Sequence, residues 1–375
     1  MLSLGGVGAM GRAASHDLAA ADEVSLTIAD VDTDAARALA DDLPGKVGIE
    51  AVDVTDPERL ESLLGGSDVV ANALPYRFNV DVMDACLDAR THYLDLGGLY
   101  HVTREQLELD EAFREAELTA VLGMGASPGM TNIAAAKGAS HLDRVDEIHI
   151  RTGAAGGGEG FAYSAKTILD ELTMEPVVYR EGEFETLSAL SGRETYEMPN
   201  PVGEVEGFHS IHSELATMPD SFAGVETVDF RVAFSPDLVA RCETLIDLGL
   251  TDEEPIDFRG ACFSPREFLD FHLDRQPAPA PAEEHKSFRV DLTGEESRND
   301  AHYRLSAVVP SRLDDWGLNA TAVWTGVPLG AAAAIVGRGD ALATGARPPE
   351  TALDPDVVIG ELRDRGIEID ERRVA

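Results

Sequence analysis

The sequence contains little lysine, little cysteine and no long apolar run. Only four of its 375 residues are lysine and three are cysteine. Cys86, Cys242 and Cys262 are far apart and odd in number, which excludes a disulfide framework and a clustered metal site. The longest apolar candidate, Gly326 to Gly337, is shorter than the roughly eighteen residues that span a bilayer. No secretory signal is recognisable. We therefore expect a cytoplasmic chain with no membrane partner and no metal.

Basic residues are also scarce. The chain has 30 basic and 69 acidic residues, which give a formal net charge of -39. The acidic residues are spread along the whole chain and form no single patch. Such a surface is typical of a protein from a halophilic source, since high salt screens the repulsion between like charges. A phosphate backbone would be repelled, so nucleic acid is not an expected partner.

The start of the chain carries a glycine pattern. A short apolar run precedes Gly6, Gly8 and Gly11, and a second apolar run, 24–28, leads to Asp30. In the order strand, turn, helix, strand and acid, this pattern is typical of a dinucleotide-binding unit. Gly6 would permit the tight turn, Gly8 the approach of a pyrophosphate, and Gly11 close packing of helix on strand. The helix N-terminus would offer N–H groups to the phosphates.

The acidic residue indicates which dinucleotide binds. The Asp30 carboxylate can accept hydrogen bonds from the ribose hydroxyls, would repel a 2′-phosphate, and is followed by Val31 and Asp32 with no arginine. NAD is therefore favoured over NADP. The residues predicted to bind the cofactor at this turn are Gly6, Val7, Gly8, Ala9, Met10, Gly11 and Asp30.

Alternating strand and helix patterns continue to about residue 124 and predict a doubly wound parallel sheet, the Rossmann architecture. Strands are expected at 1–4, 24–28, 47–54, 68–73, 93–96 and 120–122. Asp56 with Pro57, and separately Thr103 with Gln106, are typical of helix starts. Ligands bind beyond the carboxyl ends of such strands. The further cofactor contacts predicted there are Asp53, Val54, Asn72, Ala73, Leu74 and Pro75, with Asp95 and 123–129 beside the nicotinamide.

The pattern changes from about residue 145. Apolar and polar residues alternate at 147–152, 227–234, 288–292 and 303–309, which predicts a second α+β domain with a mostly antiparallel sheet. Proline and alanine alternate at 276–282, as in an exposed loop. Helices expected at 328–336 and 355–365 need an apolar partner and should pack on the first domain. We therefore divide the chain into a Rossmann domain, 1–124 completed by 326–375, and the second α+β domain, 125–325.

Several short stretches, taken in order, resemble the saccharopine dehydrogenase-like oxidoreductases, a family that includes lysine 6-dehydrogenases. They are 5–11, 93–96, 127–132, 161–164, 198–203, 212–214 and 325–328. The resemblance implies a Rossmann domain, a substrate domain on an antiparallel sheet, and often a homodimer formed through that domain. It also implies hydride transfer between nicotinamide and a carbon bearing nitrogen, on a small amino-acid substrate.

Two departures from the family pattern bear on the substrate. Ser127 stands where saccharopine-forming enzymes usually carry an aspartate, and the family's carboxylate-binding arginine has no counterpart near 200–204. Both put saccharopine in doubt and leave a type closer to lysine 6-dehydrogenase, which deaminates its substrate oxidatively. Two alternatives stay open. One is a saccharopine- or carboxynorspermidine-type reductase that condenses an amine with a carbonyl, and the other is a non-catalytic NAD-binding sensor.

The proton on the substrate nitrogen requires an acid or base, and Asp95, at a strand end, is the first candidate. Tyr163, Ser164 and Ser127 are the predicted substrate-binding residues, since hydroxyls at the head of a helix can hold a carboxylate. His212 and Glu214 are spaced to share one strand face, where they would form a polar cleft lining or a simple surface.

Overall fold

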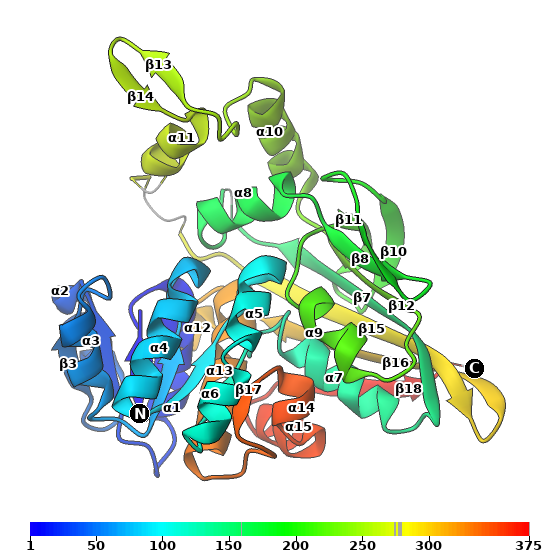
Figure 1. Cartoon of the computed structure of the whole chain (residues 1–375), viewed down its shortest axis with the longest axis horizontal. Coiled ribbons are helices and arrows are strands. Elements are labelled where there is room, and N and C mark those ends of the chain that lie inside the picture. Colours follow the sequence, from blue (N-terminus) through cyan, green and yellow to red (C-terminus); the bar gives the residue numbers. More distant parts are fainter. Residues whose placement is uncertain (159, 274, 277–279, 375) are drawn as a thin grey trace.

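The computed structural model describes residues 1–158, 160–273, 275–276 and 280–374 (Figure 1). Of the proline-alanine segment expected at 276–282, residues 277–279 therefore lie outside the described residues.

The first sheet is parallel, with strand order β17-β6-β5-β4-β1-β2-β3. This order confirms the doubly wound architecture, and all the predicted strands are present with bounds shifted by a few residues. The strands are β1 (Leu2–Leu4), β2 (Thr27–Asp30), β3 (Gly48–Ala51), β4 (Val69–Asn72), β5 (His92–Asp95), β6 (Thr119–Val121) and β17 (Gly345–Arg347). Strand β17 was not predicted, since three residues are too few to show a period.

The helices of this domain alternate with its strands. They are α1 (Ala9–Ala19), α2 (Thr33–Asp42), α3 (Pro57–Leu64), η1 (Tyr76–Phe78), α4 (Asn79–Ala89), α5 (Leu99–Leu107) and α6 (Asp110–Glu115). The start of α3 is as predicted, because the Asp56 carboxylate accepts a hydrogen bond from the Arg59 N–H at 3.2 Å. The predicted start at Thr103 and Gln106 is wrong. Both residues lie inside α5, where their side chains are buried and bond to other segments.

The second sheet is mixed and mostly antiparallel, as predicted, with order β10-β11-β12-β7-β15-β16-β18; β8 also pairs with β12, and β9 pairs with β8. Only the pairing of β12 with β7 is parallel among the described strands of this sheet. The strands are β7 (Arg144–Gly156), β8 (Val177–Arg180), β9 (Glu183–Thr186), β10 (Glu194–Met198), β11 (Gly203–His209), β12 (Thr227–Val232), β15 (Glu284–Glu296), β16 (Asn299–Pro310) and β18 (Ile369–Arg373).

Helices lie on and around this sheet, and a small arm projects at the top of Figure 1. The arm consists of α10 (Pro236–Asp247), the hairpin β13 (Ile256–Phe258) and β14 (Ala261–Phe263), and α11 (Pro265–Leu273). The remaining helices before residue 320 are α7 (Met130–Ala139), α8 (Ala165–Thr173), α9 (Glu214–Ser221) and α12 (Leu313–Trp316). The head of α8 and the start of α9 both contribute to the site described below.

Helix α13 (Ala320–Gly337) joins the two halves of the molecule. It contacts α1, β4 and β5 on one side and β15 and β16 on the other. Contrary to the sequence-based expectation, it is an 18-residue helix long and apolar enough to cross a membrane, but 89% of that window is buried inside the protein. It is therefore a core helix. The predicted helix at 328–336 is its second half.

The C-terminal segment contributes one strand to each sheet. Strand β17 extends the first sheet, whereas β18 pairs with β16 of the second sheet. Between them lie α14 (Pro349–Ala352) and α15 (Pro355–Asp364), which contact α7. The boundary that we expected between residues 325 and 326 falls inside α13, and the end of the chain is not confined to the first domain.

Helices α1 and α13 approach each other through glycine. A Cβ atom added at Gly326 would lie 2.3 Å from the Met10 carbonyl oxygen and 2.6 Å from the Ala13 Cβ. Real Cβ atoms do not approach other atoms this closely, so only glycine fits. The contact fixes the position of α1, and with it the glycine turn from which α1 starts.

We expect Gly326→Ala to lower the free energy of unfolding by about 1–3 kcal/mol, because the added methyl must push α1 away from α13. Denaturant unfolding in multimolar KCl measures this. The control is Gly360→Ala in α15, where nothing lies within 4 Å of the added Cβ. That change should leave stability unchanged or raise it by up to about 1 kcal/mol. An equal loss in both variants would contradict the packing described here.

Candidate functional site

The glycine turn has the geometry of a phosphate-binding site. A Cβ atom at Gly11 would lie 2.2 Å from the Gly5 carbonyl oxygen, so the start of α1 touches the turn backbone directly. No side chain of the described residues caps the first turn of α1, and its N–H groups are open to a bound anion. The prediction that Gly6 permits the tight turn is wrong. The positive φ of 71° belongs to Gly5, while Gly6 is required for space, because its Cβ would lie 2.9 Å from the Ile28 side chain.

Asp30 lies at the end of β2 and faces this turn. Its Oδ2 accepts a hydrogen bond from the Val7 N–H at 3.3 Å, and its Oδ1 accepts one from the Asp32 N–H at 3.1 Å. The carboxylate is half-buried. It therefore lies against the backbone of the glycine turn, beside the N-terminus of α1.

The other predicted cofactor residues divide into two groups. Ala73, Leu74 and Pro75 line a cavity together with Gly8, Ala9 and Met10. In contrast, Asn72 is fully buried and holds the end of β4, since it donates to Asn79 and to the Tyr93 hydroxyl at 3.2 and 3.1 Å.

Asp53 and Val54 follow the edge strand β3. Asp53 is exposed, and hydrogen bonds from the Thr55 hydroxyl and N–H lower the pKa of its carboxyl. Val54 is half-buried and packs on a core cluster of the first domain. Neither residue lines the cavity among the described residues.

Asp95, the predicted acid–base residue, is buried behind the residues that line the cavity. It is 1% exposed, and it is absent from the described residues that line the cavity, although its neighbours Leu96 and Gly97 do so. Burial raises the pKa of its carboxyl, and the hydrogen bonds that it accepts oppose the rise. These come from Gln106 Nε2, the Tyr93 hydroxyl, and the Gly97 and Gly123 N–H groups, at 2.5, 2.8, 2.8 and 2.7 Å. The strand-end rule thus located the correct edge, but the side chain points inward and holds the loops after β5 and β6.

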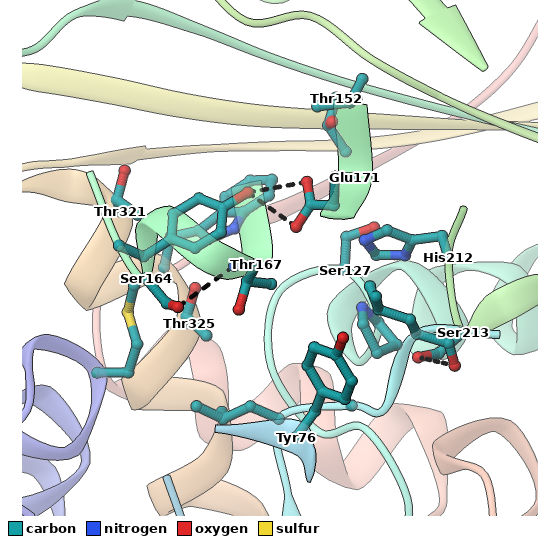
Figure 2. A pocket seen from close by; sticks show the side chains of 18 of the residues that line it. Tyr76, Ser127, Thr152, Ser164, Thr167, Glu171, His212, Ser213, Thr321 and Thr325 are labelled. Atoms are coloured by element: carbon teal, nitrogen blue, oxygen red, sulfur yellow. Dashed lines mark hydrogen bonds between the residues drawn. The ribbon is translucent and has the colours of Figure 1, made fainter. Parts of the chain in front are cut away.

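The cavity has a volume of about 390 Å³ and extends from the glycine turn to the second domain (Figure 2). Both domains supply its walls, with α1 and the loop after β4 on one side and the head of α8 on the other. Tyr76 links these sides, because its hydroxyl donates to Asp170 Oδ2 of α8 at 2.8 Å. Asp170 is in turn held by Arg266 Nη2 at 2.5 Å.

The predicted substrate residues Tyr163 and Ser164 both line the cavity. Ser164 caps α8, since its Oγ accepts the Thr167 N–H at 3.3 Å. The Tyr163 hydroxyl lies 2.9 and 2.8 Å from the two carboxylate oxygens of Glu171. Burial raises the pKa of the Glu171 carboxyl, and the nearby His212 and Lys286 act to lower it. Sequence reasoning missed Glu171, because nothing local distinguishes it from a surface acid on α8.

Ser127, the remaining predicted substrate residue, lines the cavity and donates to Glu214 Oε1 at 2.6 Å. Thr131 donates to the same oxygen at 2.8 Å. The other carboxylate oxygen of Glu214 is hydrogen bonded to Nδ1 of His212. Glu214 starts helix α9 and does not share a strand face with His212. The four side chains form a connected polar cluster between α7 and α9.

His212 has the environment of an acid–base residue. Its ring stacks on Phe230, with centroids 3.9 Å apart. Burial would lower the pKa of His212, but the Glu214 carboxylate outweighs this and raises it above the ordinary value. Conversely, burial would raise the pKa of Glu214, and His212 lowers it. Among the described residues no group bonds to His212 Nε2, and His212 lines the cavity.

His209, three residues before His212, lies outside this cluster. Its ring nitrogens are within 3.2 Å of the Phe230 carbonyl oxygen and of Arg180, and burial lowers its pKa to about 4. The described residues contain no group of His, Cys, Asp and Glu arranged to hold a metal ion.

Comparison with known families identifies the fold. Residues 1–121 match the saccharopine dehydrogenase NADP-binding domain, and residues 125–367 match the saccharopine dehydrogenase C-terminal domain. The chain belongs to the saccharopine dehydrogenase family. The resemblance read from the short motifs is thereby confirmed, and the first domain is an NAD(P)-binding domain.

Curated relatives are moderately similar. The chain is 25% identical over 305 residues to carboxyaminopropylagmatine dehydrogenase of Synechocystis sp., covering 76% of this chain and 75% of that protein. It is 26% identical over 253 residues to carboxynorspermidine synthase of Vibrio alginolyticus, covering 63% and 61%. These relatives are dehydrogenases and synthases of amine compounds, which supports an NAD(P)-dependent enzyme.

Solved structures share the whole fold. Apo saccharopine dehydrogenase (L-Glu forming) from Saccharomyces cerevisiae has a TM-score of 0.75 at 19% identity, covering 100% of this chain and 99% of that one. Homospermidine synthase of Legionella pneumophila, solved in complex with NAD, has a TM-score of 0.71 at 13% identity, covering 99% and 90%. At these identities the likeness concerns the fold alone.

We expect Asp30→Asn to weaken NADH binding by about tenfold or more, because the charge that accepts the ribose hydroxyls is lost. The preference between cofactors should shift toward NADPH, whose 2′-phosphate is no longer repelled. Fluorescence titration with both cofactors measures this. Asp34→Asn is the control, since Asp34 is an exposed carboxylate of α2 paired with Arg37 at 2.6 Å. Unchanged NADH affinity in Asp30→Asn would show that the carboxylate does not meet the ribose.

Proposed function

We propose that this protein is an NAD-dependent oxidoreductase that acts on the CH–NH group of an amino acid, as lysine 6-dehydrogenases do. The observation that carries the proposal is the buried His212–Glu214 pair. It borders a cavity that begins at the dinucleotide-binding turn, and Nε2 of His212 has no hydrogen-bond partner among the described residues. A paired histidine with a free nitrogen is suited to exchange one proton with a substrate.

NAD, when bound, supplies the acceptor for the hydride that leaves the substrate carbon. The residues of the chain then have one proton to manage. As the C–H and N–H bonds of the CH–NH group are replaced by C=N, His212 Nε2 accepts the proton from nitrogen. Water adds to the resulting imine and releases the amine and the carbonyl product.

Glu214 orients the histidine and stabilises its charged form. The carboxylate fixes the ring through Nδ1, and Ser127 and Thr131 hold the carboxylate by donating to its other oxygen. This assigns to Ser127 a supporting role one step from the substrate. We propose in the same way that Asp95, held by its four donors, positions the loops at the floor of the site, and that His212 takes the acid–base role first assigned to Asp95.

Glu171 offers a site for a substrate cation. Its carboxylate is buried in the cavity wall and bonded by the Tyr163 hydroxyl, so an ammonium group could pair with it in a water-poor environment. We therefore place the amine of the substrate between Glu171 and His212, whose charges already act on each other's pKa.

A second function is supported by the relatives. Carboxynorspermidine synthase and carboxyaminopropylagmatine dehydrogenase are curated proteins similar to this chain. In a reductase that condenses an amine with a carbonyl, His212 would donate the proton that it accepts in the oxidative reaction, so the same residues serve both directions. Homodimer formation through the second domain, a cytoplasmic location and adaptation to high salt stay predictions from the sequence.

Steady-state assays in multimolar KCl separate these functions. Reduction of NAD with L-lysine supports oxidative deamination, whereas oxidation of NADH or NADPH that requires both an amine and an aldehyde or keto acid supports the condensing reaction. Tight NADH binding without turnover of any of these substrates would leave the non-catalytic sensor.

We expect His212→Gln to lower kcat by about 10²- to 10⁴-fold, the range typical for loss of a general acid–base residue. The NADH dissociation constant should not change, because His212 does not touch the glycine turn. His101→Gln, an exposed histidine on α5, is the control and should keep full activity. Retention of kcat in His212→Gln would remove the residue from the mechanism.

The pH profile tests the role of Glu214. The oxidative reaction requires neutral His212, so kcat/KM should rise with pH through a pKa above the ordinary histidine value of 6.5. In Glu214→Gln the carboxylate that raises this pKa is gone, and the ascending limb should move to lower pH while the maximum falls. An ascending limb at the same pH in both proteins would argue against the pairing.

A further inference from the structure

A second cavity adjoins the first. It has a volume of about 470 Å³ and lies beside the head of α8 and strands β11 and β15. The two cavities share Tyr163, Ala233, Phe234 and Lys286 in their walls. These four residues therefore form the boundary between the two cavities.

Lys286 differs from the other lysines of the chain. Lys137 pairs with Asp356 at 2.7 Å, Lys166 pairs with Asp270 at 3.4 Å, and Lys46 is exposed. Lys286 is half-buried on β15, and no described carboxylate lies within 4.0 Å of its ammonium group. The charge of Lys286 acts on Glu171, whose pKa it lowers. Within the part of the chain that the structure describes, Lys286 therefore has no ion-pair partner at the boundary of the two cavities.

The nearest acid along the strand does not neutralise this cation. Glu284, two residues earlier, also lines the second cavity. Its carboxylate oxygens are occupied by the Thr321 N–H at 2.8 Å and by the Thr321 hydroxyl at 2.9 and 2.8 Å. A half-buried ammonium group that pairs with no described carboxylate is available to bind a carboxylate of a ligand.

We propose that Lys286 binds a carboxylate of the substrate, an assignment that rests on the proposed function of the same site. The substrate is then an amino acid or a carboxyalkyl amine, and a plain amine or polyamine is excluded. Its ammonium or secondary amine lies near Glu171 and His212, and its carboxylate lies at Lys286. The two opposite charges of the wall, Glu171 and Lys286, match the two charges of such a molecule.

The test compares ligands that differ by one carboxylate. L-lysine is compared with cadaverine, and carboxynorspermidine with norspermidine, by titration calorimetry of the full chain with NADH in KCl. The wild type should prefer the carboxylated member of at least one pair by about tenfold or more. Lys286→Met should abolish the preference, and Lys286→Arg should retain it. Lys46→Met, at an exposed lysine, is the matched control.

The outcomes separate this inference from the proposed function, because binding needs no turnover. A preference that survives in Lys286→Met overturns the inference, as does a wild type with no preference in either pair. If Lys286→Met weakens NADH binding and keeps the preference, Lys286 serves the cofactor and the inference is also overturned. The assignment of Lys286 stands if the preference depends on it, even where His212→Gln leaves turnover intact and the proposed chemistry fails.

Discussion

The structure depends on two close contacts between backbones at helix α1, each of which requires a glycine. Gly11 lets the first turn of α1 rest on the Gly5 carbonyl, and Gly326 lets α13 reach the Met10 carbonyl. A side chain at either glycine would move α1, and its N-terminus would no longer point at the place where a pyrophosphate can bind. Because α13 also packs on β15 and β16, the same contact sets the second sheet against the first. The cavity between the domains follows from this arrangement.

The ionisable groups at the cavity are buried together with hydrogen-bond partners. His212 is bonded to Glu214, and the Glu171 carboxylate accepts from the neutral Tyr163 hydroxyl, in surroundings where such interactions are stronger than in water. Removing one member would leave the other buried without its partner, at a substantial cost in stability. The acidic outer surface has a different physical basis. Exposed charges of one sign favour solubility, and salt screens the repulsion between them.

The sequence predicted those parts that local order determines. The glycine turn, Asp30, the strand positions and the class of the second sheet could be predicted because each rests on spacing along one segment. The depth of a side chain cannot be predicted in this way, and Asp95 therefore looked exposed at a strand end although it points into the core. Glu171, His212 and Lys286 belong to segments that are distant in sequence and meet only in the folded chain. Thr103 and Gln106 have the spacing of a capping pair. In the folded chain they lie inside α5, where their buried side chains bond to Ser213 and Asp95 instead.

The most direct test of the account follows the hydride itself. The protein is incubated with NADH deuterated at the transferable position of the nicotinamide, together with an amine and a carbonyl partner, and the amine product is analysed by mass spectrometry. The account predicts one deuterium on the carbon that bears the nitrogen. Oxidation of the cofactor without deuterium at that carbon, or with deuterium on a carbon bearing oxygen, would contradict it.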